Sequence, residues 1–191
     1  MDLLLKAIKH YIPLSAKDEA TIHALFKQKT LKKGEHLLEA GHICRYVFFI
    51  ESGLVRYYTT SDGEEQTTYF NKEAEFVCNY LSFMPQSAST VNIQALEDTV
   101  VWMISYAGLQ KLYQTVEHGE RFGRLAIEQV YVTAISQITS LYTDSPEVRY
   151  HKFLTSYPDI RQRIPQYYIA SYVGVKPQSL SRIRKRIAAK R

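Results

Sequence analysis

The spacing of apolar residues changes twice along the chain. Residues 3–12 and a segment that begins at Ser15 carry apolar side chains at helical spacing, and Asp18, three positions after Ser15, completes a typical helix start. From about residue 28 to residue 105, short runs rich in β-branched and aromatic residues alternate with turn signals, as in an antiparallel sandwich or roll. The helical period returns at Ala107. The pattern therefore predicts an all-β unit between helical segments.

One hairpin in the β region is predicted with a defined turn. Asp62 and Gly63 separate the strand-like runs LVRYYTTS and EEQTTYF. An Asp-Gly pair readily adopts the positive φ angles that a two-residue hairpin turn requires. We therefore expect residues 54–61 and 64–70 to be neighbouring antiparallel strands.

A long helix is predicted from Glu117 to Thr143. Its apolar residues form two stripes, one made of Phe122, Leu125, Val130, Ala134, Ile138 and Leu141 and the other of Ile127, Tyr131 and Ile135. One stripe can pack on the β unit, and the other needs a different partner. Such a helix either runs through its own domain or pairs with a second copy of itself. We favour pairing, which predicts a homodimer.

A break follows the long helix at residues 144–147. Asp144 or Ser145 is the expected cap of a further helix. That helix is expected to end just before Pro158, because proline cannot continue a helix. Arg161–Ile164 is then predicted to form a short strand of a wing.

Residues 165–191 predict two short helices joined by a tight turn. Gly174 lies where the reversing chain needs a backbone conformation that a Cβ atom disfavours. Pro177 fits the first position of the second helix, where its missing N–H group is not needed. In that helix, three apolar residues at helical spacing are expected to face inward: Leu180, Ile183 and Ile187. This arrangement is a helix-turn-helix.

The positive charge of the chain is concentrated at the same end. Seven basic residues and no acidic residue follow Val175: Lys176, Arg182, Arg184, Lys185, Arg186, Lys190 and Arg191. Because the whole chain has a net charge of +5, residues 1–175 carry a net charge of −2. Such a surface favours binding to a polyanion. The alternative is a solvated basic tail, but the charges coincide with an apolar repeat and a turn glycine, so we favour DNA binding.

The overall composition is that of an ordinary globular protein, with 46% hydrophobic and 23% charged residues in a chain of 191. That length suits one large domain or two small ones. Cys44 and Cys78 do not make a disulfide framework. No segment has the character of a signal peptide or a membrane span. We therefore expect a cytoplasmic protein without membrane contact.

A few residues have side chains that could bind a metal or react with an oxidant. His36, His42 and Cys44 are close enough in sequence to ligate a metal or haem, but no carboxylate lies in an obvious supporting register, so a structural role is favoured. Cys78 is interpreted as a buried structural cysteine, because no cationic neighbour in the sequence would lower its pKa. No catalytic triad or phosphate-binding glycine loop stands out. We expect no enzyme activity, no catalytic residue, no metal and no cofactor.

Two parts of the chain carry a family signature. Lys33–Gly41 and Tyr46–Arg56 form glycine-bounded strand segments, and Ile169–Val175 with Ser179–Lys185 form a DNA-binding phrase. Together they resemble the Crp/Fnr family of bacterial transcription regulators, in its Bacteroidetes-type form, over nearly the whole chain. The resemblance implies an α+β fold with an N-terminal antiparallel, jelly-roll-like β-roll and flanking helices. A long dimerisation helix and a C-terminal winged helix-turn-helix would follow.

The resemblance also implies a domain organisation. Residues 1–116 would form a cyclic-nucleotide-binding-like sensor domain, 117–143 the dimerisation helix and 144–191 the DNA-binding domain. The implied partners are double-stranded DNA with a palindromic site, a second copy of the chain and RNA polymerase. The implied DNA-binding residues are Lys176, Pro177, Gln178, Ser179, Ser181, Arg182, Lys185 and Arg186. Among them, Gln178, Ser179 and Arg182 would reach base edges. Lys176, Lys185 and Arg186 would contact phosphates.

The implied effector pocket departs from the pattern of cyclic-nucleotide binders. The corresponding residues are Phe76, Val77, Cys78, Asn79, Tyr80, Ser89, Thr90 and Asn92. Asn79 replaces the carboxylate that holds the ribose, and Ser89 or a neighbour replaces the arginine that binds the phosphate. There is no Lys or Arg between Glu73 and Trp102. Because a buried phosphodiester without a guanidinium partner is costly, we predict no tight cyclic AMP binding.

Three readings of the whole chain remain open at this point. The favoured one is a DNA-binding transcription regulator in which an unknown effector shifts a hinge near residues 142–146. A variant of it is a constitutive regulator whose cavity is filled by its own Phe and Tyr side chains. The alternative from another class is a small-molecule- or metal-binding β-barrel protein with an incidental basic tail.

Overall fold

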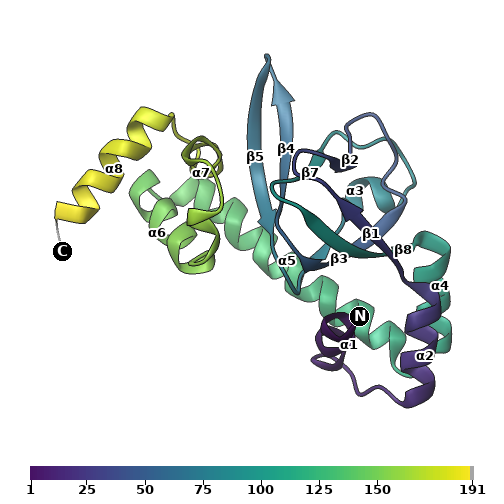
Figure 1. Ribbon diagram of the computed structural model, residues 1–191. Coiled ribbons are helices and arrows are strands. Elements are labelled where there is room, and N and C mark those ends of the chain that lie inside the picture. The colour runs from purple at the N-terminus through teal and green to yellow at the C-terminus, as the bar shows by residue number, and fades with distance from the viewer. Residues whose placement is uncertain (190–191) are drawn as a thin grey trace. The chain divides into compact units, whose positions relative to one another are not determined.

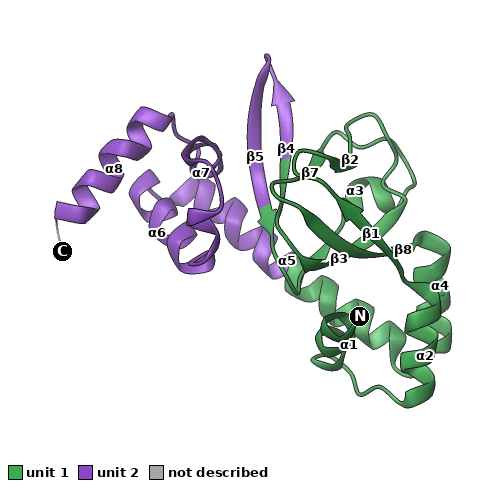
Figure 2. Ribbon diagram, in the orientation of Figure 1, with its two compact units in different colours: residues 1–57, 70–130 green, residues 58–69, 131–191 purple. Residues whose placement is uncertain are grey.

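The computed structural model describes residues 1–189, so Lys190 and Arg191 of the basic segment lie outside the described residues. The chain clusters into two compact units (Figure 2). The N-terminal unit comprises residues 1–57 and 70–130, and the C-terminal unit comprises residues 58–69 and 131–191. These units divide the chain within the long helix, and the domain limits at 116 and 143 stay a prediction.

Two helices open the N-terminal unit, α1 (Asp2–Lys9) and α2 (Ala16–Leu25). The predicted start of the second helix is confirmed, because Ser15 and Asp18 form a capping box. The backbone N–H of Asp18 donates to Ser15 Oγ at 3.2 Å, and the backbone N–H of Ser15 donates to Asp18 Oδ2 at 3.0 Å. The reciprocal bonds satisfy backbone donors that a helix start otherwise leaves unpaired.

The predicted β region forms two four-stranded sheets (Figure 1). The strands are β1 (Lys27–Leu31), β2 (His36–Leu38), β3 (Tyr46–Ser52), β4 (Val55–Ser61), β5 (Glu64–Asn71), β6 (Phe76–Val77), β7 (Asn92–Ala95) and β8 (Thr99–Ser105). One sheet has the order β1-β8-β3-β6 and the other β2-β7-β4-β5. The described strands therefore make a roll of two sheets rather than one closed barrel. The β-barrel fold expected in the alternative interpretation is thus wrong for the described residues.

The predicted hairpin turn is confirmed. Asp62 and Gly63 lie between β4 and β5 with φ angles of 52° and 78°. Two successive residues with positive φ are what a tight hairpin turn requires, and glycine accepts this backbone without a Cβ clash.

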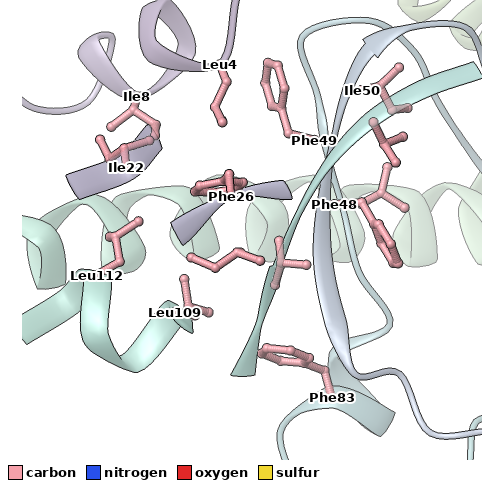
Figure 3. Close-up of a cluster of buried hydrophobic side chains, with 14 of the residues drawn as sticks. Leu4, Ile8, Ile22, Phe26, Phe48, Phe49, Ile50, Phe83, Leu109 and Leu112 are labelled. Atoms are coloured by element: carbon pink, nitrogen blue, oxygen red, sulfur yellow. The ribbon is translucent and has the colours of Figure 1, made fainter. Parts of the chain in front are cut away.

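The core of the N-terminal unit joins its helices to both sheets. In Figure 3, Ile8 of α1, Ile22 of α2 and Phe49 of β3 point into one buried cluster, and each of the three is fully buried. Two short helices complete this unit, α3 (Tyr80–Phe83) and α4 (Tyr106–Thr115). Burial of this apolar surface is the main force that holds the β-roll and its flanking helices together.

Helix α5 (Gly119–Thr143) starts two residues after the predicted Glu117. Near its start, Phe122 is buried in the core of the N-terminal unit. Further along, large apolar side chains are exposed: Val130, Tyr131, Val132, Ile135, Ile138, Leu141 and Tyr142. Both predicted apolar stripes are thus buried or half-buried near the start of α5 and exposed from Val130 onward in the single chain. Among residues 1–189, no helix combines the length and the apolar character needed to cross a bilayer.

Three further α-helices lie in the C-terminal unit, α6 (Pro146–Ser156), α7 (Gln166–Val173) and α8 (Pro177–Ala189). Ser145 caps α6 by accepting from the backbone N–H of Val148 at 3.4 Å.

The prediction of a wing strand at Arg161–Ile164 is wrong, because a short 3-10 helix, η1 (Ile160–Gln162), occupies this stretch. The backbone N–H of Arg163 donates to the carbonyl of Ile160 at 2.9 Å. Ile160 and Ile164 are both buried, at the i, i+4 spacing of a helical turn. A single strand here would have left its backbone groups without a neighbouring strand.

Candidate nucleic-acid interface and sensor site

The turn between α7 and α8 has the geometry that the sequence predicts. Gly174 adopts a left-handed conformation with φ 74° and ψ 40°. Its backbone N–H donates to the carbonyl of Ser171 at 3.0 Å, and that of Val175 donates to the carbonyl of Ala170 at 2.9 Å. These bonds satisfy the last carbonyls of α7. Ala170 is fully buried, as expected for a small residue where two helices cross closely.

Helix α8 has a buried face and a polar exposed face. Leu180 and Ile183 are 1% and 4% exposed, and Ile187 is half-buried, so the predicted inward face is confirmed. Seven of the eight predicted DNA-binding residues are exposed: Lys176, Pro177, Gln178, Ser181, Arg182, Lys185 and Arg186. Ser179 is half-buried. Their contacts with DNA stay a prediction.

Some cations of this surface have partners within the C-terminal unit. Arg186 Nη1 lies 3.7 Å from Glu147 Oε2 of α6, and Arg184 Nη1 donates to Gln166 Oε1 at 2.7 Å. Arg182 and Lys185 have no ion-pair partner among residues 1–189. These two cations are therefore available to an external anion without loss of an internal bond.

Arg149 of α6 is a structural residue that the sequence analysis missed. Its Nε donates to the carbonyl of Val173 at 2.8 Å, which is the end of α7. Its Nη1 donates to the carbonyls of Asp144 at 2.7 Å and Leu141 at 3.5 Å. One guanidinium thus bonds the ends of α5 and α7 at once. An arginine outside α8 has no sequence signal for this role.

The residues before α6, predicted to be a hinge, are held by Asp144. Its Oδ2 accepts from Lys152 Nζ at 2.6 Å and from Ser140 Oγ at 2.5 Å. These two hydrogen bonds, Lys152 first, hold the pKa of the Asp144 carboxyl below its ordinary value. The carboxylate therefore links the last turn of α5 to α6.

The hairpin residues of the C-terminal unit contact α7 and the residue that follows α6. The backbone N–H of Thr67 donates to Ser171 Oγ at 2.8 Å, and that hydroxyl donates to the carbonyl of Glu65 at 3.3 Å. The Tyr69 ring meets the Tyr157 ring edge to face, with centroids 6.5 Å apart. A side chain of the helix-turn-helix thus bonds the backbone of the hairpin.

The structure brings together Asn79 and Ser89, the two key positions of the predicted pocket. Asn79 Nδ2 donates to Ser89 Oγ at 2.7 Å, and Ser89 Oγ donates to the carbonyl of Val91 at 2.8 Å. Asn79 and Ser89 are 9% and 3% exposed. Asn92 Oδ1 accepts from the backbone N–H of Ala40 at 2.9 Å. These polar groups are thus bonded within the chain.

The other predicted pocket residues differ in exposure. Val77 is fully buried, Thr90 is exposed, and three others are half-buried: Phe76, Cys78 and Tyr80. A cavity of about 470 Å³ in the N-terminal unit is lined by β2 and the loop after it. None of the eight predicted residues is among the described residues that line this cavity.

Arg56 of β4 is a second residue that the sequence analysis missed. Although it is 1% exposed, its Nε and Nη2 donate to Gln94 Oε1 at 3.1 and 2.8 Å. Gln94 Nε2 in turn donates to the carbonyl of Gly34 at 3.0 Å. The β-roll therefore contains a buried guanidinium, outside the stretch between Glu73 and Trp102 in which the sequence has none. The β-strand pattern alone does not reveal that this arginine faces inward.

The residues considered for metal binding lie near the same cavity. His36 Nδ1 and His42 Nδ1 lie 3.7 and 3.9 Å from the carboxylate of Glu39, and His36, His42 and Cys44 all line the cavity. Among the described residues, no group of three or more His, Cys, Asp or Glu side chains is placed to hold a metal ion.

Comparisons with known proteins agree with this architecture. Residues 28–116 match the family described as cyclic nucleotide-binding domain. The transcriptional activator protein FnrA of Stutzerimonas stutzeri is 36% identical over 103 residues, which cover 53% of this chain and 41% of FnrA. The matched region thus spans less than half the length of that relative.

Solved structures match over more of the chain. FixK2 of Bradyrhizobium japonicum has a TM-score of 0.74 and 18% identity, over 86% of this chain and 85% of FixK2. A Crp/Fnr-family putative transcriptional regulator of Eubacterium rectale has a TM-score of 0.70 and 20% identity, over 95% of this chain and 88% of its own. At this identity the likeness shows the fold.

The fold places this chain in a class of proteins defined by three elements. These elements are a cyclic-nucleotide-binding-type β-roll, a long helix and a C-terminal helix-turn-helix, in that order. In this order of elements the chain is similar to a solved regulator of the Crp/Fnr family, and its residues 28–116 match the cyclic nucleotide-binding domain family.

Proposed function

We propose that this chain is a homodimeric, sequence-specific DNA-binding transcription regulator that does not respond to cyclic AMP. The observation that carries the proposal is the two-sided character of α8. Leu180 and Ile183 fix one face in the interior, while Gln178, Ser181 and Arg182 extend from the opposite face into solvent. Amide, hydroxyl and guanidinium groups on one exposed helix face suit base edges in the major groove.

The exposed part of α5 supports a dimer. Tyr131 and Ile138 are one heptad apart, as are Ile135 and Tyr142, and all four side chains are exposed. The spacing of four, three and four residues is the a/d pattern of a coiled-coil seam. These four residues are called the α5 seam below. A second copy of the same helix is the partner that fits this pattern, because a two-fold axis presents the same seam from both sides.

A dimer would present two copies of α8 to one duplex. Two-fold symmetry then matches a palindromic site whose half-sites are about one helical turn apart, roughly 34–36 Å. Lys176 and Lys185 would contact phosphates and make the affinity fall steeply with salt. RNA polymerase is the further partner that a transcription regulator of this family would need.

The polar groups of residues 76–92 support the absence of cyclic AMP binding. Asn79 and Ser89 bond each other, so a nucleotide would have to break these bonds and bury a phosphate there. The buried guanidinium of Arg56 already donates to Gln94. Isothermal titration calorimetry should therefore detect no binding of cyclic AMP at micromolar concentrations. A micromolar dissociation constant would contradict this part of the proposal.

The role of α8 is tested by an Arg182→Ala variant. We expect its affinity for a duplex selected by the wild-type chain to fall by about 1–3 kcal/mol, or roughly 5- to 150-fold, with relaxed specificity at one position of each half-site. Fluorescence anisotropy on the selected duplex and on single-base variants of it measures both effects.

The matched control is Arg121→Ala, which removes the same charge from an exposed position near the start of α5. This control should stay within about twofold of the wild-type affinity, because a distant exposed charge acts only through screened electrostatics. Equal affinity and equal specificity of the Arg182→Ala variant and the wild type would exclude Arg182 from the interface.

A further inference from the structure

Cys44 and Cys78 are 34 residues apart in sequence but adjacent in the fold, with 4.0 Å between their Sγ atoms. Cys44 lies in the loop between β2 and β3, and Cys78 follows β6 directly. Both thiols are free. A disulfide needs a sulfur–sulfur distance of about 2.05 Å, so a closure of about 2 Å would join them.

The backbone at each cysteine is fixed by a side-chain hydrogen bond. The N–H of Cys44 donates to Ser82 Oγ at 2.9 Å, and the N–H of Cys78 donates to Tyr57 Oη at 3.0 Å. Ser82 is 1% exposed, so the first of these bonds lies in the interior. The two thiols are therefore held close by the fold rather than by chance side-chain motion.

A small oxidant can approach the pair. Although Cys44 is 1% exposed, it is one of the residues that line the cavity of about 470 Å³. Cys78 is half-buried and lies next to it. A molecule as small as hydrogen peroxide fits such a space easily.

The two thiols also differ in acidity. The hydrogen bond from Cys78, with further backbone hydrogen bonds at Asn79 and Tyr46, lowers the pKa of Cys44 to about 7. Burial, and then the neighbouring Cys44, raises the pKa of Cys78 well above its ordinary value. Cys44 is thus the nucleophile of the pair, since the thiolate is the form that reacts.

We propose that Cys44 and Cys78 form a reversible intramolecular disulfide when the protein meets a peroxide. The Cys44 sulfur attacks one peroxide oxygen, the O–O bond breaks, and water leaves with formation of a sulfenic acid on Cys44. The Cys78 sulfur then attacks the Cys44 sulfur, and the S–O bond breaks with release of a second water. In total, two thiols lose two electrons and two protons, and one hydrogen peroxide becomes two waters.

The disulfide would join Cys78 to the loop after β2, which is also bonded to Ser89. The N–H of Gly41 donates to the carbonyl of Ser89 at 2.7 Å, and the N–H of Ser89 donates to the carbonyl of His42 at 2.8 Å. Closure at Cys44 would therefore act directly on the loop that bonds Ser89 and Asn92. The input of the N-terminal unit would then be an oxidant rather than a nucleotide.

The test uses the full reduced chain with hydrogen peroxide as the probe. After treatment and quenching, free thiols are alkylated under denaturing conditions, and intact mass and peptide mapping follow the products. We expect both thiols to disappear together, with a mass lower by two hydrogens and a linked peptide that contains Cys44 and Cys78. Dithiothreitol should restore both thiols.

Two single substitutions separate the two chemical steps, because each leaves one cysteine whose oxidation can be followed alone. In Cys78→Ser, Cys44 should accumulate as a sulfenic acid trapped by dimedone, at least about tenfold more than in the wild type. In Cys44→Ser, Cys78 should be oxidised at least about tenfold more slowly, because it lacks the acidic partner. Circular dichroism verifies that both variants are folded.

If a variant fails to fold, peroxide treatment of the wild-type chain still tests the proposal. Two thiols that survive peroxide, a disulfide between two chains, or over-oxidised Cys44 without a linked peptide would each contradict it. Equal oxidation rates of Cys78 in the wild type and in Cys44→Ser would contradict the order of the steps.

Discussion

Helix α8 and residues 76–92 both carry polar side chains where the family resemblance implies ligand binding, yet they present them in opposite ways. On α8, Gln178 and Arg182 are exposed, and the apolar side chains face inward. In residues 76–92, Asn79 and Ser89 are nearly buried and bond each other. A polar group already bonded in the interior costs free energy to expose or re-pair, whereas an exposed one costs little. This difference supports the proposal that α8 binds DNA and that residues 76–92 do not bind a cyclic nucleotide.

The largest effect is expected on dimerisation, when the exposed α5 seam of the C-terminal unit is changed. In Ile138→Glu, a dimer would bury two carboxylates in the α5 seam without partners, at a cost of about 3 kcal/mol or more. We therefore expect the dimer dissociation constant to rise at least about 100-fold. Sedimentation velocity over a range of concentrations measures the change.

The control for this variant is Ser136→Glu, another exposed position on the same helix but away from the α5 seam. It should dimerise like the wild type. If the wild type is a monomer, or if both variants dissociate equally, the exposed apolar residues of α5 do not form a self-pairing seam.

A smaller effect is expected from Arg149, which bonds the end of α7 just before the turn to α8. Arg149→Ala removes donors to the carbonyls of Val173 and Asp144, so we expect a loss of about 2 kcal/mol of unfolding free energy. Arg149→Lys should recover only part of the loss, because an ammonium cannot reproduce the planar fork. Urea unfolding measures both variants, and wild-type stability of Arg149→Ala would show that these bonds contribute nothing.

The smallest effect is expected from an inward-facing carboxylate of the N-terminal unit. Asp18 is 4% exposed and accepts from Ser15 Oγ at 2.6 Å and from the backbone N–H of Glu117 at 3.0 Å. These bonds, with that of Ser15 first, lower the pKa of the Asp18 carboxyl. Asp18→Asn should cost about 1 kcal/mol at neutral pH.

The destabilisation caused by Asp18→Asn is expected to depend on pH in one direction. Because the folded-state pKa of Asp18 is lowered, its stabilisation is present above the unfolded-state pKa and is lost as the pH falls through the folded-state pKa. The stability difference between the wild type and Asp18→Asn should therefore shrink on acidification. Urea unfolding from neutral to acidic pH measures it, and a difference that grows with acidity would contradict the assignment.

The elements that could be predicted from the sequence are those with a local cause. The Ser15 cap depends on residues three positions apart, the Asp62-Gly63 turn on two adjacent residues, and the register of α8 on the spacing of Leu180 and Ile183. In each case neighbouring residues determine the backbone or the buried face. The structure therefore agrees with the sequence at these places.

The features that could not be predicted depend on contacts distant in sequence. Cys44 and Cys78 are separated by 34 positions, and the pairing of β3 with β6 brings their segments together. Arg149 reaches Val173 across 24 positions. The sequence predicts a wing strand at Arg161–Ile164, whereas the structure has a local helical turn there. Pairwise contacts of this kind leave no periodic signal in a single sequence.

The most direct test of the central claim is selection of DNA by the wild-type chain from a random-sequence library. The account predicts a palindrome whose two half-sites are centred about 10–10.5 base pairs apart, because two copies of α8 would enter successive major grooves on one face of the duplex. Absence of any enriched sequence, or enrichment of a single unpaired half-site, would contradict a dimeric regulator that reads DNA through α8.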